Sequence, residues 1–160
     1  MIWIRKVTVI YLLIIFILAL ALAPLLHVVP SKYQRRVARL RECAALQGLF
    51  VEFRSIPGGN LSSSERAGHQ PGKTIYYGLR IPASVRSNRP RAAWVYGEEG
   101  WRSLPRGRAI PAALEGLPRA VFAASTDEGS CGVYWQEAGE EAEIKQIYRS
   151  LSGLIEEGLS

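Results

Sequence analysis

The N-terminal part of the chain contains one long apolar segment that carries no charged side chain. It extends from Val7 to Ser31 and is rich in Leu, Ile, Val and Ala. At about 1.5 Å of rise per helical residue, such a segment is long enough to cross a hydrocarbon layer about 30 Å thick. Pro30 lacks a backbone N–H and ends a helix at this point. We therefore predict a transmembrane helix over residues 7–29, preceded by a short N-terminal tail over residues 1–6.

A cleavable signal peptide is the alternative interpretation of this segment. Arg5 and Lys6 are typical of the charged start of such a peptide, and the Ala-rich stretch that follows offers cleavage sites. However, the apolar run is longer than the usual apolar region of about 7–15 residues. Cleavage after Ala23 would also place Pro24 directly behind the cut. We therefore expect the segment to be retained.

Basic residues follow the apolar segment directly, and they indicate its orientation. They outnumber Arg5 and Lys6 on the other side, and Lys and Arg near a span are retained preferentially in the cytosol. The charge distribution therefore favours a cytosolic C-terminal domain. The members of this basic group are Lys32, Arg35, Arg36, Arg39 and Arg41.

The same residues belong to a second predicted helix, over residues 31–47. Ser31 and Gln34 have the spacing of a capping box, and Gly48 is a typical helix end. A basic helix next to a membrane contacts anionic lipid headgroups, each Lys or Arg contributing on the order of 1 kcal/mol. We therefore expect the five basic residues to contact the membrane surface. A solvated connector between membrane and domain is the alternative.

Residues 48–160 predict one small α+β domain. Apolar side chains alternate along several short segments, and the last segment has apolar residues at helical spacing. We expect a mostly antiparallel sheet with a short helix and a C-terminal amphipathic helix packed on it. The predicted strands are 49–57, 74–82, 120–126 and 131–137 with a hairpin over 92–104 that turns at 97–100, and the predicted helices are 110–118 and 140–159.

No motif in the chain predicts catalysis. Residues 67–74, AGHQPGKT, match a loosened phosphate-loop pattern, but that loop needs a strand before it and a helix after it, and neither is predicted here. Outside the apolar segment the only histidine is His69, in the same loop, and no cluster has metal-ligand spacing. We therefore predict no catalytic residue, no metal site, no cofactor and no enzymatic activity.

A second basic stretch, residues 79–111, interleaves arginines with Trp94, Tyr96 and Trp101. Such a mixture binds nucleic acid by charge and stacking, anionic lipid, or an acidic protein surface; alternatively the aromatics are core residues and the arginines a solvated rim. A membrane-tethered domain favours lipid or protein over nucleic acid. The predicted docking surface consists of Arg86, Arg89, Arg91, Trp101 and Arg102.

The chain has two cysteines, Cys43 and Cys131, without a C-x-x-C motif. Buried thiols are usual in the cytosol, whereas a disulfide is expected only in an oxidising compartment. The alternative function is therefore a periplasm-facing binding or envelope-assembly domain with a Cys43–Cys131 disulfide.

The order of apolar span, Pro30 and the basic helix SKYQRRVARLRECAALQGL resembles the start of the small accessory subunit of bacterial preprotein translocase. It is also similar to uncharacterised single-pass bacterial membrane proteins. The resemblance covers residues 7–48; Gly58 and Gly59 match the subunit's glycine pair, but its Asp is missing. The resemblance implies one span in the bacterial inner (plasma) membrane, a cytosolic domain and a protein partner in a membrane complex. It carries over no catalytic residues.

Overall fold

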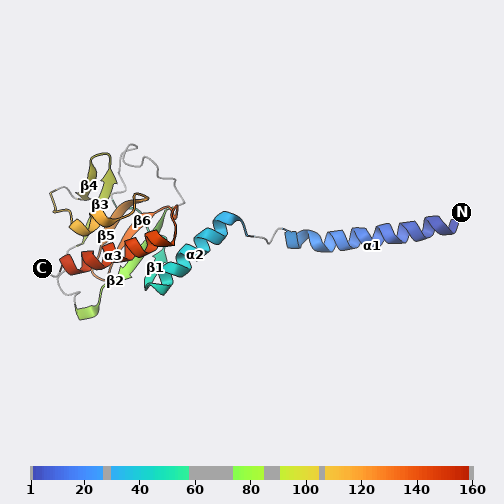
Figure 1. The fold of residues 1–160 in the computed structure, drawn as a ribbon, viewed down its shortest axis with the longest axis horizontal. Coiled ribbons are helices and arrows are strands. Elements are labelled where there is room, and N and C mark those ends of the chain that lie inside the picture. The colour runs from blue at the N-terminus through green and yellow to red at the C-terminus, as the bar shows by residue number, and fades with distance from the viewer. Residues whose placement is uncertain (1, 27–29, 58–73, 85–90, 105–106, 159–160) are drawn as a thin grey trace. The chain divides into compact units, whose positions relative to one another are not determined.

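The computed structural model describes residues 2–26, 30–57, 74–84, 91–104 and 107–158. The chain forms two units, residues 1–35 and 36–160. The second unit contains one six-stranded antiparallel sheet and a C-terminal helix, which confirms the α+β prediction. The elements in chain order are α1 (Ile2–Leu26), α2 (Lys32–Leu46), β1 (Leu49–Glu52), β2 (Ile75–Arg80), β3 (Ala92–Gly97), β4 (Gly100–Leu104), the 3₁₀ helix η2 (Ala112–Gly116), β5 (Val121–Thr126), β6 (Ser130–Trp135) and α3 (Glu141–Glu157) (Figure 1).

Helix α1 occupies the apolar segment. It begins at Ile2, so most of the predicted tail over residues 1–6 is helical, and it is described as far as Leu26. Its side chains are described over residues 9–22, where the large apolar ones are 46–66% exposed. Taken over the residues that the structure describes, no helix has both the length and the apolar character needed to cross a membrane.

Helix α2 lies where the capping box predicts it. The Ser31 backbone N–H donates to Gln34 Oε1 at 2.8 Å, and the Gln34 N–H donates to Ser31 Oγ at 3.2 Å. These two bonds satisfy donors that the first turn of a helix leaves unpaired. Gly48 follows the helix with a φ of 79°, a conformation that glycine adopts without steric cost.

The sheet has the strand order β1-β2-β6-β5-β3-β4. Both predicted hairpins are present, β3–β4 with Gly97 opposite Gly100, and β5–β6 around Asp127. The pairing of β2 with β6 joins strands that are distant in the sequence. Strands β1 and β4 therefore form the two edges of the sheet.

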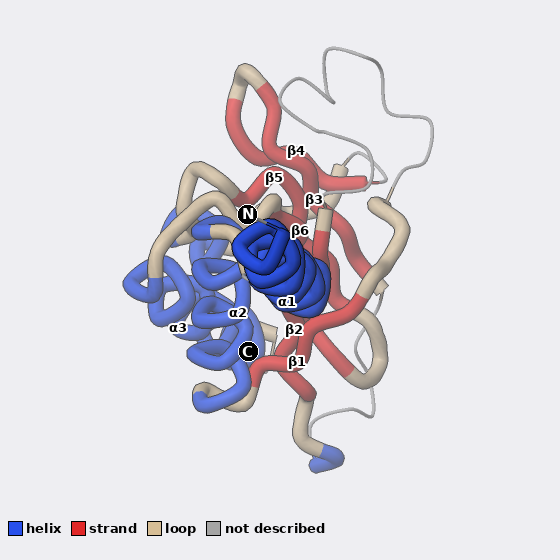
Figure 2. Tube along the Cα trace, turned by 90° about the vertical axis from the view of Figure 1, so that its right-hand side faces the viewer, coloured by secondary structure: helices blue, strands red, loops and turns tan. Residues whose placement is uncertain are grey.

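Helices α2, η2 and α3 cover one face of the sheet (Figure 2). Glu140 and Glu143 form a capping box at the start of α3, and the apolar side of this helix packs onto β2 and β6. This packing confirms the predicted C-terminal helix. The main core between helices and sheet includes Leu40 and Ala44 of α2, Leu114 of η2, Ile144, Ile147, Leu151 and Leu154 of α3, and Tyr77, Trp94, Val133 and Trp135 of the sheet.

The opposite face of the sheet carries a second apolar cluster. It consists of Tyr76, Val95, Ala123 and Tyr134. Beneath it, Gly78 lies directly opposite Gly132 in the pairing of β2 with β6. A Cβ atom on either glycine would overlap the ring of Tyr76, so these glycines allow the ring to lie directly against the sheet backbone.

Both cysteines are free thiols in the structure. Cys131 is buried in the main core, with its Sγ 3.7 Å from the backbone oxygen of Leu151. Cys43 is partly buried on α2. The Cys43–Cys131 disulfide of the alternative interpretation is therefore not formed in this structure.

Candidate functional site

Four of the five predicted membrane-contact residues form one exposed stripe on α2. Lys32, Arg35, Arg36 and Arg39 have the spacing i, i+3, i+4 and i+7, which places side chains on a single side of a helix. All four are exposed. We call these four residues the basic stripe. The buried residues of the helix, Leu40 and Ala44, lie farther along it and about a quarter to a third of a turn around its axis from the stripe.

Arg41 does not belong to the basic stripe. Its Nε donates to Glu137 Oε1 at 2.7 Å and its Nη2 donates to Glu137 Oε2 at 2.9 Å. Its guanidinium is therefore engaged by a carboxylate of its own domain, and lipid contact by Arg41 stays a prediction. Arg41 lies apart from the stripe because it is about half a turn around the helix from Arg39 and Lys32.

Glu137 is the most deeply buried charged side chain of the described residues, with 2% of its surface exposed. Tyr77 Oη donates to its Oε1 at 2.8 Å, completing a three-residue group with Arg41. The hydrogen bonds that Arg41 donates to Glu137 raise the pKa of Arg41, and burial, together with Glu137, raises the pKa of Tyr77. A buried carboxylate is stable only when it is paired in this way. The group fixes α2 to β2 and to the segment between β6 and α3.

The described members of the second predicted surface, Arg91, Trp101 and Arg102, lie at separate places in the fold. Arg86 and Arg89 lie outside the described residues. Arg91 lies at the start of β3, in an exposed ion pair with Glu128 whose N–O distance is 3.4 Å. Trp101 and Arg102 are consecutive in β4, and consecutive residues of a strand point to opposite faces.

The two faces of β4 separate these side chains. Trp101 packs against the main core, on the side of the helices. Arg102 is opposite Val95, a member of the second apolar cluster, and shares its face of the sheet. Trp101 and Arg102 thus lie on opposite faces of the sheet, and a docking surface that includes both stays a prediction.

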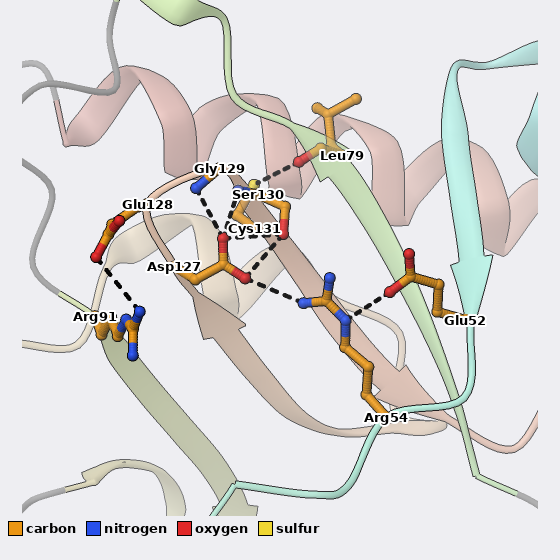
Figure 3. A network of polar contacts seen from close by, with 9 residues as sticks. All are labelled: Glu52, Arg54, Leu79, Arg91, Asp127, Glu128, Gly129, Ser130 and Cys131. Carbon is orange, nitrogen blue, oxygen red and sulfur yellow. Dashed lines mark hydrogen bonds and ion pairs between the residues drawn. The ribbon is translucent and has the colours of Figure 1, made fainter.

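A network of charges that the sequence did not reveal lies beside the second apolar cluster (Figure 3). Arg54 bonds to Glu52 at 2.8 Å and to Asp127 at 3.1 Å, and its guanidinium lies 4.2 Å from the centre of the Tyr76 ring. Asp127 also accepts the backbone N–H groups of Gly129 and Ser130. Burial raises the pKa of Asp127, but these bonds outweigh it and the net pKa is lowered. The network holds the β5–β6 turn against the chain that follows β1.

An open pocket of about 880 Å³ lies beside the β3–β4 hairpin. Its other walls are the chain from η2 to β5 and the first two turns of α3. Helix α3 packs on β2, β6 and η2, and the β3–β4 hairpin extends beyond it. The pocket lies in the space that this arrangement leaves beside the hairpin. Tyr96 and Trp101 lie on its floor with ring centres 5.3 Å apart. Carboxylates line it from three elements, namely Glu99, Glu115 and Glu143. We call it the acidic pocket.

The described residues show no arrangement that suggests metal chemistry. Within those ranges, no group of three or more His, Cys, Asp and Glu side chains is placed to hold a metal ion. Residues 58–73, which include His69 and most of the loosened phosphate-loop pattern, lie outside the description. The predicted lack of catalytic residues and of cofactors stays a prediction.

Comparison with known proteins gave no match. No family model matches the chain, and neither the curated proteins nor the solved structures contain a match. The resemblance of residues 7–48 therefore stays an expectation, and the function must be argued from the residues themselves.

Proposed function

We propose that the chain is a single-pass membrane protein that holds a small non-catalytic α+β domain at the cytosolic surface of a bacterial inner membrane. One observation carries the proposal: the described side chains of α1, residues 9–22, are uncharged and exposed, and the basic stripe follows them on the next helix. Exposed apolar side chains in an uninterrupted row are unfavourable in water and favourable in hydrocarbon. In the sequence, the stretch without charged side chains runs from Val7 to Ser31.

The basic stripe supports the orientation and the surface contact. Positive charges close to a span favour the cytosolic side, and they attract the anionic lipids of that leaflet. The stripe contains four of these charges on one side of α2, and all four side chains are exposed, whereas Arg41 is paired with Glu137. We infer that anionic headgroups are what the stripe contacts. A docking role for the domain fits the absence of any catalytic motif in the sequence, and the free thiols suit a reducing compartment.

Reporter fusions at the C-terminus test the orientation. Alkaline phosphatase is active only outside the cytosol, whereas a fluorescent protein of the common type matures inside it. We expect the wild-type fusions to fluoresce and to show little phosphatase activity. Replacing the four residues of the basic stripe by Gln removes the charge bias, and phosphatase activity should then rise several-fold, because Lys and Arg near the span set the topology.

A matched control removes the same amount of charge from the domain. Arg91, Arg119, Lys145 and Arg149 are exposed and lie far from the apolar segment in the sequence. Their replacement by Gln should leave both reporter signals unchanged. Strong phosphatase activity of the wild-type fusion with a dark fluorescent reporter would reverse the proposed topology.

A further inference from the structure

We propose that the acidic pocket is a docking site for a basic segment of a partner protein, one that carries an apolar or aromatic side chain next to Lys or Arg. The proposal concerns the domain alone and does not depend on the membrane anchor. It rests on the shape of the pocket, the aromatic side chains on its floor and the sign of its charge.

The floor of the pocket offers an apolar surface that the domain does not cover. Tyr96 is 44% exposed and stacks edge-to-face on Trp101, and Ile110 across the pocket is 47% exposed. Aromatic side chains that are held rigidly in a concave site are typical of the centre of protein interfaces. The ring pair is rigid because Trp101 packs against the main core. The pocket is therefore prepared to receive an apolar side chain.

The charge at the pocket is opposite to that of the whole protein. The chain has a formal net charge of +6, yet Glu99, Glu115 and Glu143 line the pocket, and among its described lining residues only Arg119 is basic. In the part of the chain that the structure describes, the carboxylates of Glu99 and Glu115 form no ion pair and no hydrogen bond. Carboxylates in this arrangement attract a cationic partner and repel anionic lipid or nucleic acid. Charge complementarity thus selects Lys or Arg in the occupant.

The position of the pocket at a sheet edge suggests the form of the occupant. Strand β4 is the edge strand and contributes Gly100 and Trp101 to the lining. An extended peptide binds an exposed edge through main-chain hydrogen bonds, and its alternate side chains enter the neighbouring pocket. We therefore expect an extended segment in which a basic side chain reaches Glu99 or Glu115 while its apolar neighbour covers Tyr96.

Fluorescence anisotropy with labelled peptides tests this proposal on the full-length protein in a nonionic detergent. The probes are the basic peptide GLKWRLG, its acidic counterpart GLEWELG and the apolar-free peptide GSKSRSG. We expect only the first to bind measurably. The double variant E99Q/E115Q should weaken its binding about fivefold, since each partly exposed charge pair contributes modestly.

The matched control is E98Q/E141Q, which removes one carboxylate from the same turn as Glu99 and one from the first turn of α3, neither of which lines the pocket. It should change the affinity less than twofold, and the melting temperatures of both variants should equal that of the wild type. Equal binding of GLKWRLG to both double variants, or no binding to the wild type, would overturn the proposal. So would self-association of the protein that E99Q/E115Q abolishes, because the occupant would then be a second copy.

Discussion

Two neighbouring tyrosines of β2 differ completely in their surroundings because they point to opposite faces of the sheet. Tyr76 lies in the second apolar cluster, where its hydroxyl is buried without a hydrogen bond of good geometry; burial raises its pKa to about 12, against a smaller lowering by nearby Ser130. Tyr77 lies in the main core and donates to the buried Glu137. One hydroxyl is therefore an energetic cost and the other is a required donor.

Replacing each of these tyrosines by Phe separates the two roles. Tyr77→Phe should lower the free energy of unfolding by about 2 kcal/mol, because it deprives a buried carboxylate of a donor. Tyr76→Phe should leave the free energy of unfolding unchanged or raise it by up to about 1 kcal/mol, because the substitution removes a poorly satisfied buried hydroxyl. Urea unfolding followed by tryptophan fluorescence measures both values. Equal destabilisation by the two substitutions would contradict the assigned hydrogen bonding.

The lowered pKa of Asp127 makes the stability of the domain depend on pH. Its pKa in the folded state lies below the ordinary aspartate value of about 3.9, so ionised Asp127 stabilises the fold above that pH. This contribution is lost as the pH falls through the folded-state pKa. Asp127→Asn lacks the titrating group, and its stability should approach that of the wild type below about pH 4. Unfolding curves at pH 7, 5, 4 and 3 test this; a stability difference that stays constant over this range would argue against it.

At the scale of elements, two glycines differ in how much room their surroundings leave for a side chain. A Cβ on Gly132 would lie 2.5 Å from the carbonyl oxygen of Tyr77, and backbone atoms of a central strand cannot move aside. A Cβ on Gly153 of α3 would meet only the Cβ of Ala113, at 3.4 Å. The first position is closed to a methyl group, whereas the second is open.

Alanine substitutions should therefore have opposite effects at these two positions. Gly132→Ala should lower the free energy of unfolding by about 3 kcal/mol through overpacking. Gly153→Ala should leave it unchanged or raise it by up to about 1 kcal/mol, because alanine favours a helix. Thermal unfolding of both variants beside the wild type is the measurement. A stable Gly132→Ala variant would show that β2 and β6 are not packed as described.

The sequence predicted those elements whose signals are local. The capping box at Ser31, the turn over residues 97–100 and the apolar spacing of α3 each identify an element from a few neighbouring residues, and each prediction was confirmed. The residues of the basic stripe can also be identified from their helical spacing in the sequence. The sequence-based prediction nevertheless included Arg41 with them. Its partner Glu137 is far away in the sequence, so nothing local indicated the pairing.

At the scale of the whole molecule, the features that sequence reasoning missed are those made by distant segments. The pairing of β2 with β6 sets the strand order, and no local pattern specifies which strands become neighbours. The acidic pocket is likewise built from β4, η2 and α3, and the network of Arg54 with Asp127 joins β1 to the β5–β6 turn. Trp101 and Arg102 lie on opposite faces of β4, a separation that a pattern of charge and aromaticity does not contain by itself.

Alkaline carbonate extraction of cell membranes tests the proposed anchor most directly. We expect the untagged full-length chain to remain in the membrane pellet after the wash. A variant with Leu13→Arg and Ile17→Arg in α1 should shift to the supernatant or be degraded, because each arginine costs about 2.5–3.5 kcal/mol in the middle of a span. The anchor would be contradicted by wild-type protein that appears full-length in the supernatant, free of lipid.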